Sequence, residues 1–286
     1  MALLLCAIIW GTSFVVLKNT LSSIGTMWVL SIRFTVSAVL LAAAAGKRLK
    51  KVSHRCIQGG ALAGLSLALA YIVQTYGLVY TTPGKNAFLT ATYCVLTPFL
   101  AWLVYKRRPG LANVAAAFLC ITGIGFVSLN EGLGNVNIGD MLTLMCGFFY
   151  AFQVIILEHY KDSGEAVTIS VVQFTVAALI CWVGAVLFEP APENVSVDAW
   201  LGIAYLSVAC TAICFFLQAW GIQYTNSSVA AMIMTLESVF GVLTSVLFYG
   251  ELVTGKMLLG FVLIFMAVIF SEVKLPFLKG HKPDRA

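Results

Sequence analysis

Charge is scarce in this sequence. Only 10% of its 286 residues are Asp, Glu, Lys or Arg, whereas 60% are hydrophobic and the mean hydropathy is +0.96. A soluble domain of this size needs far more charge on its water-facing surface. The scarcity of charge therefore excludes a soluble protein and indicates one that resides in a lipid bilayer.

Signatures of catalysis and metal binding are also missing. The sequence contains no HExxH, GxSxG or paired-Asp motif, and the three histidines, His54, His159 and His281, lack metal-ligand spacing. The eight cysteines form no CxxC pair and mostly fall in apolar runs, so we interpret them as small buried hydrophobic residues. Without a Walker A sequence, an ATP-driven pump would need a partner subunit. We expect no enzymatic activity, no cofactor and no metal.

Long apolar runs fill most of the chain. A run of about 20 residues is enough for a helix to cross the hydrocarbon core, and backbone groups inside a bilayer must bond within their own helix. The sequence predicts ten such helices, over Ala2–Leu17, Met27–Ala45, Gly59–Val79, Ala87–Tyr105, Leu111–Leu129, Gly139–Leu157, Thr168–Phe188, Trp200–Ile222, Val229–Phe248 and Gly255–Ser271. The predicted fold class is an all-α polytopic membrane protein.

Basic residues alternate between the loops. Those that share one side of the predicted topology are Lys47, Arg48, Lys50, Lys51, Arg55, Lys106, Arg107, Arg108, Lys161, Lys274, Lys279, Lys282 and Arg285. The opposite side has only Lys18, Lys85 and Lys256. The positive-inside rule therefore places both termini in the cytoplasm, in a multi-pass protein of the cytoplasmic (inner) membrane. We interpret the basic clusters as topology signals that touch anionic lipid, and expect no nucleic-acid binding.

The second half of the chain repeats the first. The stretch RFTVSA at Arg33 returns as QFTVAA at Gln173, an offset of 140 positions, and the same offset aligns Trp10 with Tyr150. At an offset of 144, QTYGLVYTT at Gln74 matches QAWGIQYTN at Gln218. Matches in order at nearly constant offset indicate a duplication.

An odd number of spans in each copy has a geometric consequence. After five spans the second copy begins on the other side of the membrane, so the two repeats are inverted, the architecture that supports alternating access in many secondary transporters. We predict a first five-helix repeat over residues 1–130, a second over residues 131–275, and a basic cytoplasmic tail over residues 276–286.

Three motifs give the chain a family resemblance. They are WGTSFVVLK at Trp10–Lys18, QTYGLVYTTPGKNAFLTATYCVLTPFLAW at Gln74–Trp102, and LESVFGVLTSVLFYGE at Leu236–Glu251. On these motifs, and over essentially its whole length, the chain resembles EamA-type transporters of the drug/metabolite transporter superfamily. The resemblance implies ten spans in two inverted repeats, a central cavity lined largely by the third, fourth, eighth and ninth spans, and transport of small metabolites or drugs, often export. Ser238 follows Glu237 where family members often have proline, so the family's kink is not carried over.

Glu237 is the leading candidate for a site residue. A carboxylate near the middle of the bilayer costs ~2.5–3.5 kcal/mol on insertion scales, so it calls for a reason. It either faces the cavity, where it counters a cationic group or takes up a proton, or it locks the ninth helix to a neighbour. Tyr93 is its mate at offset 144 and either contacts substrate or only packs. Gln74 and Gln218 either bind substrate or bond across helices.

Two basic residues have competing roles. Arg33 either recognises an anion in the cavity or has a structural role, snorkelling to the interface or pairing with a carboxylate. Lys85 lies at an outer helix end and is a candidate gate of the outer mouth, in a motif where we expect Pro83 and Gly84 to form a tight turn. Aromatic residues that could wall the cavity, or simply pack in the core or against lipid, are Trp10, Tyr71, Tyr76, Phe149, Tyr150 and Trp220.

These observations favour a secondary transporter, an exporter of amino acids or related amphipathic compounds. Its expected partners are a small-molecule substrate and membrane lipids. Proton coupling, facilitated diffusion and a homodimer stay open. The alternatives are a passive channel, which saturable counterflow would distinguish from a carrier, and a structural or sensory membrane protein, which gives Glu237 and the repeat no purpose.

Overall fold

The computed structural model describes residues 1–106, 108–128, 137–160, 163, 165–215, 217–218 and 227–272. Every secondary-structure element in these ranges is helical, as the apolar runs predict. The α-helices are α1 (Ala2–Thr20), α2 (Thr26–Ala45), α3 (His54–Tyr80), α4 (Pro83–Ala91), α5 (Tyr93–Tyr105), α6 (Leu111–Ser128), α7 (Ile138–His159), α8 (Ala166–Phe188), α9 (Val197–Ser207), α11 (Ser227–Thr244) and α12 (Gly255–Glu272). A 3-10 helix, η1 (Gly46–Lys51), follows α2, and π-helical turns follow α9 and α11 as η3 (Val208–Ile213) and η4 (Ser245–Tyr249).

The helices suit a membrane by length and composition. Within the described residues, seven stretches are long and apolar enough to cross a bilayer: Ala2–Thr20, Thr26–Leu49, His54–Tyr80, Pro83–Tyr105, Leu111–Ser128, Ile138–His159 and Ala166–Phe188. Three shorter apolar stretches are Val197–Ile213, Leu236–Tyr249 and Gly255–Ser271. Each predicted run overlaps one of these stretches. The count of ten complete spans stays a prediction, because residues 216 and 219–226 lie outside the described ranges.

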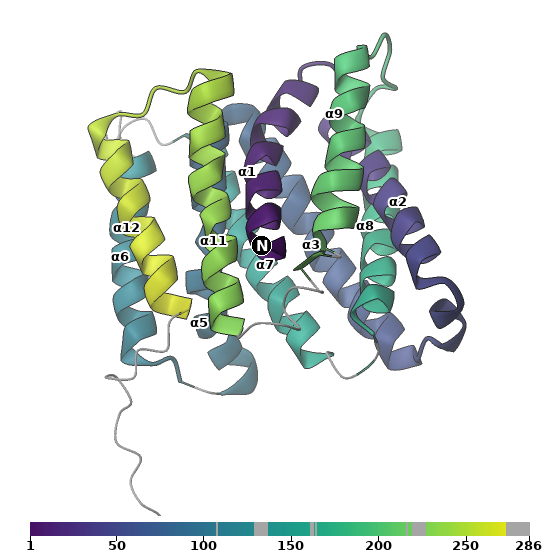
Figure 1. The fold of residues 1–286 in the computed structure, drawn as a ribbon, viewed down its shortest axis with the longest axis horizontal. Coiled ribbons are helices and arrows are strands. Elements are labelled where there is room, and N and C mark those ends of the chain that lie inside the picture. Colours follow the sequence, from purple (N-terminus) through teal and green to yellow (C-terminus); the bar gives the residue numbers. More distant parts are fainter. Residues whose placement is uncertain are drawn as a thin grey trace, which may run out of the picture.

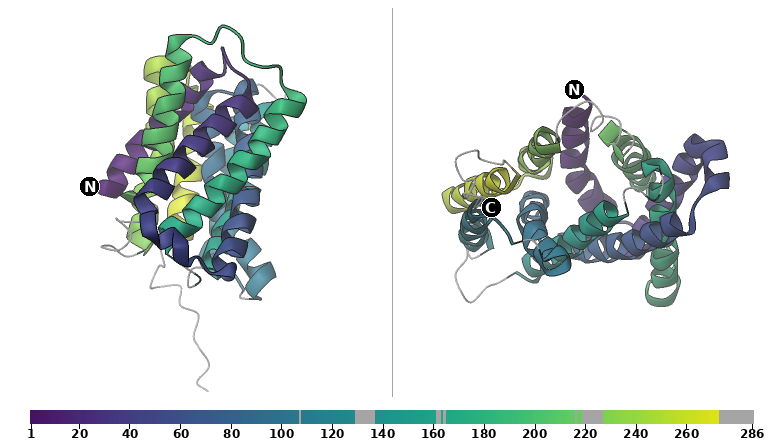
Figure 2. Two further views of the ribbon diagram at one scale, coloured as in Figure 1. Left: turned by 90° about the vertical axis from the view of Figure 1, so that its right-hand side faces the viewer. Right: turned by 90° about the horizontal axis from the view of Figure 1, so that it is seen from below.

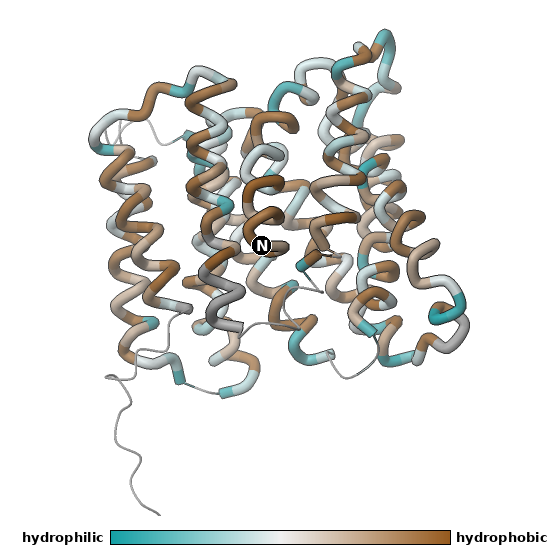
Figure 3. Tube along the Cα trace, in the orientation of Figure 1, coloured by the Kyte–Doolittle hydropathy of each residue, from teal (hydrophilic) through white to brown (hydrophobic). Residues whose placement is uncertain are grey.

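The helices stand roughly side by side between two sides of the molecule (Figures 1 and 2). Apolar residues dominate their lengths, whereas hydrophilic residues gather mostly at their ends (Figure 3). The helix α3 packs along α7 and α8, and α2 packs along α8. On the left in Figure 1, α6 packs along α12, and nearer the middle α1 packs along α11. The α2–α3, α5–α6 and α7–α8 connections lie on one side of the molecule, at the bottom in Figure 1, and we call it the basic side because Lys47, Arg48, Arg55 and Lys106 belong to these connections or border them. We call the opposite side, at the top in Figure 1, the upper side.

The fourth predicted run differs from expectation. It begins at Pro83 rather than Ala87 and is interrupted at Thr92, where α4 ends and α5 begins. Pro83 and Gly84 are the first residues of α4 rather than a turn before it, and the Thr82 hydroxyl caps this helix by accepting from the backbone N–H of Lys85. Proline suits the first helical turn, because its missing N–H would have no intrahelical partner there.

Glycines let α3 and α7 meet closely at the upper side. A Cβ atom on Gly139 would lie 2.6 Å from the carbonyl oxygen of Gly77, and one on Gly77 would lie 2.7 Å from the Thr143 hydroxyl. Small residues permit such backbone contact between membrane helices. The upper halves of α3 and α7 therefore form a tight seam.

Candidate functional site

A cavity of ≈ 470 Å³ lies in the interior of the helix bundle. The resemblance implies lining by the predicted third (Gly59–Val79), fourth (Ala87–Tyr105), eighth (Trp200–Ile222) and ninth (Val229–Phe248) spans. Residues of α1, α2, α7 and α8 line the cavity as well. The lining residues are Trp10, Ser13, Phe14, Leu17, Arg33, Leu67, Tyr71, Gln74, Thr90, Tyr93, Tyr150, Gln153, Val154, Leu157, Ala166, Ile169, Ser170, Gln173, Phe215, Gln218, Met234 and Glu237. Its volume suits a small organic molecule.

Residues at the repeat offsets meet around this cavity. Five pairs at offset 140 line it: Trp10 with Tyr150, Ser13 with Gln153, Phe14 with Val154, Leu17 with Leu157, and Arg33 with Gln173. Four pairs at offset 144 also line it: Tyr71 with Phe215, Gln74 with Gln218, Thr90 with Met234, and Tyr93 with Glu237. Equivalent positions of the two halves of the sequence thus face one space.

All seven residues that the sequence predicts as substrate-binding line this cavity: Trp10, Arg33, Gln74, Tyr93, Tyr150, Gln218 and Glu237. Lys85 does not line it and lies at the upper side. Of the other predicted aromatic residues, Tyr71 lines the cavity, Tyr76 and Phe149 do not, and Trp220 lies outside the described residues. Their contact with a substrate stays a prediction.

Arg33 and Glu237 give the cavity one basic and one acidic side chain. Arg33 is 3% exposed, and its Nε donates a hydrogen bond of 2.8 Å to the Thr211 hydroxyl. Its guanidinium carbon also lies 4.8 Å from the centre of the Tyr71 ring, within range of a cation–π interaction. Among the described residues, no carboxylate lies within 4.0 Å of this guanidinium, and no cation lies within 4.0 Å of the Glu237 carboxylate. These two side chains share one cavity without forming an ion pair with each other.

The two glutamine amides differ in how far the protein already occupies them. The Gln74 carbonyl oxygen accepts a bond of 2.9 Å from the Tyr150 hydroxyl, and its amide nitrogen donates one of 2.9 Å to Thr90. Within the described part of the chain, the Gln218 amide nitrogen donates only to the weak acceptor Sδ of Met234, at 3.5 Å. Gln74 therefore ties α3 to α4 and α7, whereas Gln218 keeps more hydrogen-bonding capacity for a ligand.

Aromatic rings form a wall beside these polar groups. Trp10 and Phe215 meet edge to face with ring centres 5.7 Å apart, and Tyr71 and Tyr150 do so at 5.5 Å. Tyr93 lies 6.0 Å from Tyr150. The indole N–H of Trp10 donates to the carbonyl of Cys210, so this ring is fixed in place. Such a wall suits an apolar or aromatic group of a ligand.

Sequence reasoning missed other cavity residues, although the repeat held a signal for them. Gln153 and Gln173 share a hydrogen bond of 3.1 Å between α7 and α8, and both line the cavity. Gln173 begins the stretch that echoes Arg33, and Gln153 is the mate of Ser13. Listing the mate of every polar residue in the predicted spans would have found both.

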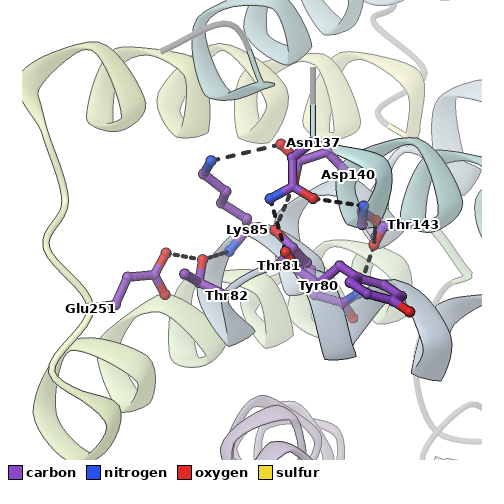
Figure 4. A network of polar contacts seen from close by, with 10 residues as sticks. Tyr80, Thr81, Thr82, Lys85, Asn137, Asp140, Thr143 and Glu251 are labelled. Carbon is purple, nitrogen blue, oxygen red and sulfur yellow. Dashed lines mark hydrogen bonds and ion pairs between the residues drawn. The ribbon is translucent and has the colours of Figure 1, made fainter. Parts of the chain in front are cut away.

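A second polar cluster lies at the upper side (Figure 4). The Lys85 ammonium lies 3.7 Å from Oδ2 of Asp140, and the other oxygen of this fully buried carboxylate accepts a bond of 2.5 Å from the Thr81 hydroxyl. Lys18 donates to the carbonyls of Leu78, Val79 and Thr81. These contacts tie α1, α3, α4 and α7 together.

Glu251 extends this cluster to η4. Its buried carboxylate accepts from the Thr82 hydroxyl, from the backbone N–H of Gly84 at 2.9 Å and from the Ser245 hydroxyl. The carboxylate therefore stabilises the N-terminus of α4, where unpaired N–H groups favour negative charge. Glu189, just after α8, does the same for α2 by accepting from the backbone N–H of Met27. We call the contacts of Lys85, Asp140, Thr81, Thr82 and Glu251 the upper latch.

The cavity approaches the two sides unequally. Toward the basic side its lining reaches Leu157, two residues from the end of α7, and Ala166, the first residue of α8. Toward the upper side it stops at Leu17 and Gln74, with the α3–α7 seam and the upper latch beyond. In the described residues, the lining thus comes within two residues of the end of α7 at the basic side, whereas along α3 it stops six residues before the upper end.

The fold and the cavity together define a multi-pass helical membrane protein with a polar site inside its bundle. Comparison with known families makes this specific: the chain matches the EamA-like transporter family over residues 1–129 and 137–272. The chain belongs to this family, as the sequence motifs predict.

Individual relatives agree with this assignment. An uncharacterized transporter of Archaeoglobus fulgidus is 30% identical over 275 residues, which cover 96% of this chain and 86% of the relative. A probable terminal-alkyne amino-acid exporter of Streptantibioticus cattleyicolor is 25% identical over 244 residues, or 82% of this chain and 79% of the relative. A solved crystal structure with 15% identity shares the fold, with a TM-score of 0.68 over 94% of this chain and 96% of that one.

Proposed function

We propose that this protein is a secondary transporter that exports small zwitterionic metabolites, amino acids above all, across the cytoplasmic membrane. One observation supports the proposal: in the described residues, a basic side chain, Arg33, and an acidic one, Glu237, border the same cavity and form no ion pair with each other. Buried charges are costly unless they are paired or hydrogen-bonded. A ligand with both a carboxylate and an ammonium group satisfies both at once.

The two halves of the sequence diverge where these charges stand. Arg33 has the neutral Gln173 as its mate, and Glu237 has the neutral Tyr93. Each half thus contributes one charge to a site that its partner half leaves uncharged. The aromatic wall next to the charges gives room for an apolar side chain, which favours an amphipathic amino acid. The amino-acid exporter among the relatives supports the same substrate class.

Alternating access between two inverted five-helix repeats is the mechanism that we propose. Two observations support it: nine residue pairs, five at offset 140 and four at offset 144, line one cavity, and the family match falls into two segments of similar length. The basic residues of the α2–α3 and α5–α6 connections favour a cytoplasmic location for the basic side and for both termini. In this arrangement the cavity extends toward the cytoplasm.

The upper latch is our candidate for the closed outer gate, with Lys85 as one of its members. Asp140 and Lys85 join α7 to α4, and Glu251 joins η4 to α4, so the latch bridges segments of both proposed repeats. Opening the cavity outward requires these contacts to separate. The substrate then leaves between α4, α7 and η4.

A thermal-stability screen of the purified protein tests the substrate class. Amino acids are compared with their decarboxylated amines and with carboxylic acids that lack the amine, on wild type, Glu237→Gln and Arg33→Gln. A ligand at 100 times its dissociation constant stabilises by ~2.7 kcal/mol, which raises the Tm measurably. We expect an amino acid to stabilise wild type only. Glu193→Gln, a change at an exposed carboxylate, is the matched control.

Other outcomes decide against parts of the proposal. If amines stabilise wild type as well as amino acids do, Arg33 is not a ligand for the carboxylate. If both variants respond like wild type, the zwitterion site is wrong. Saturable counterflow of the stabilising compound in liposomes then distinguishes a carrier from a channel, and the same assay with and without a pH gradient separates proton coupling from facilitated diffusion.

A further inference from the structure

The π-helical turn η3 follows α9, within the predicted eighth span, beside the cavity. A π turn shifts the hydrogen-bonding register of a helix, and such turns are frequent at functional sites. Here side chains of other helices take the carbonyls of this region: Ser37 donates to Ser207 at 2.9 Å, and Trp10 donates to Cys210 at 2.6 Å. The turn is therefore fixed to α2 and α1 rather than left loose.

Thr211 lies in the middle of this turn and is fully buried. Its hydroxyl donates a bond of 2.9 Å to the carbonyl of Leu206, five residues earlier. Because the hydroxyl proton is used in this way, the oxygen is an acceptor, and it accepts the bond of 2.8 Å from Nε of Arg33. The direction of this pair of bonds is thus determined by the turn itself.

The contact fixes Arg33 at one edge of its guanidinium. Nε is bound to Thr211, and Nη2 lies 3.4 Å from the Tyr71 hydroxyl, while Nη1 has no hydrogen-bond partner in the described part of the chain. A guanidinium held at Nε keeps its plane fixed, which is the condition for two-point binding of a carboxylate. Leu67, the mate of Thr211 at offset 144, has no hydroxyl, so the other half lacks this device.

We infer that Thr211, held by the π-helical turn, is a positioning residue that orients the Arg33 guanidinium to bind the carboxylate of the ligand. The inference rests on the proposed function, because it assigns the anion-binding end of the same site. It adds an orientation for the bound ligand: the carboxylate lies toward η3 and the amine toward α11. Loss of the Thr211 hydroxyl releases the guanidinium and weakens carboxylate binding.

Protection of Arg33 from a guanidinium-specific reagent tests this directly. The purified protein is treated with phenylglyoxal, and modification of Arg33 is followed by peptide mass spectrometry at increasing benzoate. Benzamide, which has the same ring without the negative charge, is the ligand control, and the exposed Arg48 and Arg55 are internal controls. The variants are Thr211→Val, which keeps the shape of the side chain, and Thr211→Ser, which keeps the hydroxyl. Thr211→Ala is a second variant without the hydroxyl, should the valine protein fail to fold.

We expect benzoate, and not benzamide, to protect Arg33 in wild type and in Thr211→Ser. In Thr211→Val the half-protecting benzoate concentration should rise roughly tenfold, the loss expected for one hydrogen bond to a charged group. Equal protection in Thr211→Val and wild type, or no protection of wild type, overturns the inference. An equal change in the modification of Arg48 by phenylglyoxal also overturns it, because the effect of the substitution is then not specific to the site.

The outcome separates this inference from the proposed function. If benzoate protection depends on the hydroxyl but no amino acid stabilises the protein, Thr211 positions Arg33 and the zwitterion is the wrong substrate class. If amino acids stabilise the protein and protection is indifferent to the hydroxyl, the substrate class stands and the role of Thr211 is wrong.

Discussion

Replacing Glu251 by glutamine should open the upper side of the molecule. The carboxylate accepts from two hydroxyls and from the backbone N–H of Gly84. Glutamine has nearly the same shape but keeps only one acceptor oxygen and presents an amide N–H₂ in place of the other. At least one of the three donors therefore loses its partner.

The expected magnitude follows from these contacts. A hydrogen bond to a charged group contributes about 1.5–3 kcal/mol, and each 1.4 kcal/mol corresponds to a factor of ten in an equilibrium constant. Loss of one such bond in the closed form alone shifts the balance between closed and open upper sides by roughly 10- to 150-fold toward open. The buried position of Glu251, at 7% exposure, argues for an effect within this range rather than the smaller one of a surface group.

Accessibility of an introduced cysteine measures this shift. Ser13→Cys places a thiol on the cavity wall, and a charged, membrane-impermeant thiol reagent is applied from the upper side. The eight native cysteines are all buried, so labelling of the protein without Ser13→Cys should give a low background. Glu251→Gln should raise the labelling rate by about the factor above, whereas the exposed Glu193→Gln should leave it unchanged.

An unchanged labelling rate in a folded Glu251→Gln protein would refute the reasoning. It would mean that the carboxylate stabilises only the N-terminus of α4, equally in both states, and that the upper latch is not a gate. An equal rise in labelling from the basic side would instead indicate general loosening of the bundle.

Three further predictions concern stability and are checked by thermal unfolding in detergent. Gly139→Ala should lower the free energy of unfolding by about 1–3 kcal/mol, because its Cβ would lie 2.6 Å from a carbonyl oxygen of α3. The control Gly125→Ala, whose Cβ would meet no atom within 4 Å, should be neutral or stabilising. Equal Tm values for the two variants would contradict the close seam. Glu189→Gln should cost about 0.5–2 kcal/mol as a weakened cap of α2, and an unchanged Tm would show that the cap is dispensable. Glu165→Gln should change stability by less than about 1 kcal/mol, because its ion pair with Arg48 is largely exposed; a larger loss would reveal a structural role for that pair.

Much of the candidate site could be predicted because the repeat constrained it. Glu237 was notable as a carboxylate within an apolar run, and the offset of 144 then pointed to Tyr93. Both line the cavity, together with Gln74 and Gln218. A residue and its repeat mate occupy equivalent places in the two halves of the sequence, so a pattern along one dimension indicated proximity in three.

The latch could be predicted only in part. Lys85 was expected at the outer mouth from its place at a helix end, but its partner Asp140 lies in another helix and has no distinguishing spacing from it. The role of Glu251 depends on the break between η4 and α12 and on the N–H groups at the N-terminus of α4 that have no partner within that helix. These are contacts between distant segments, which a local sequence pattern does not encode.

The sequence by itself determined the environment, the helical class and the family of this protein. The physical reason is that the bilayer demands long apolar helices, and these leave a direct trace in composition and run length. Only the tertiary structure decided that Arg33 and Glu237 share a cavity without pairing, that Gln74 is engaged by Tyr150 and Thr90, and that Thr211 holds Arg33. Hydrogen-bond partners depend on distances of a few tenths of an ångström between helices, and packing alone sets those distances.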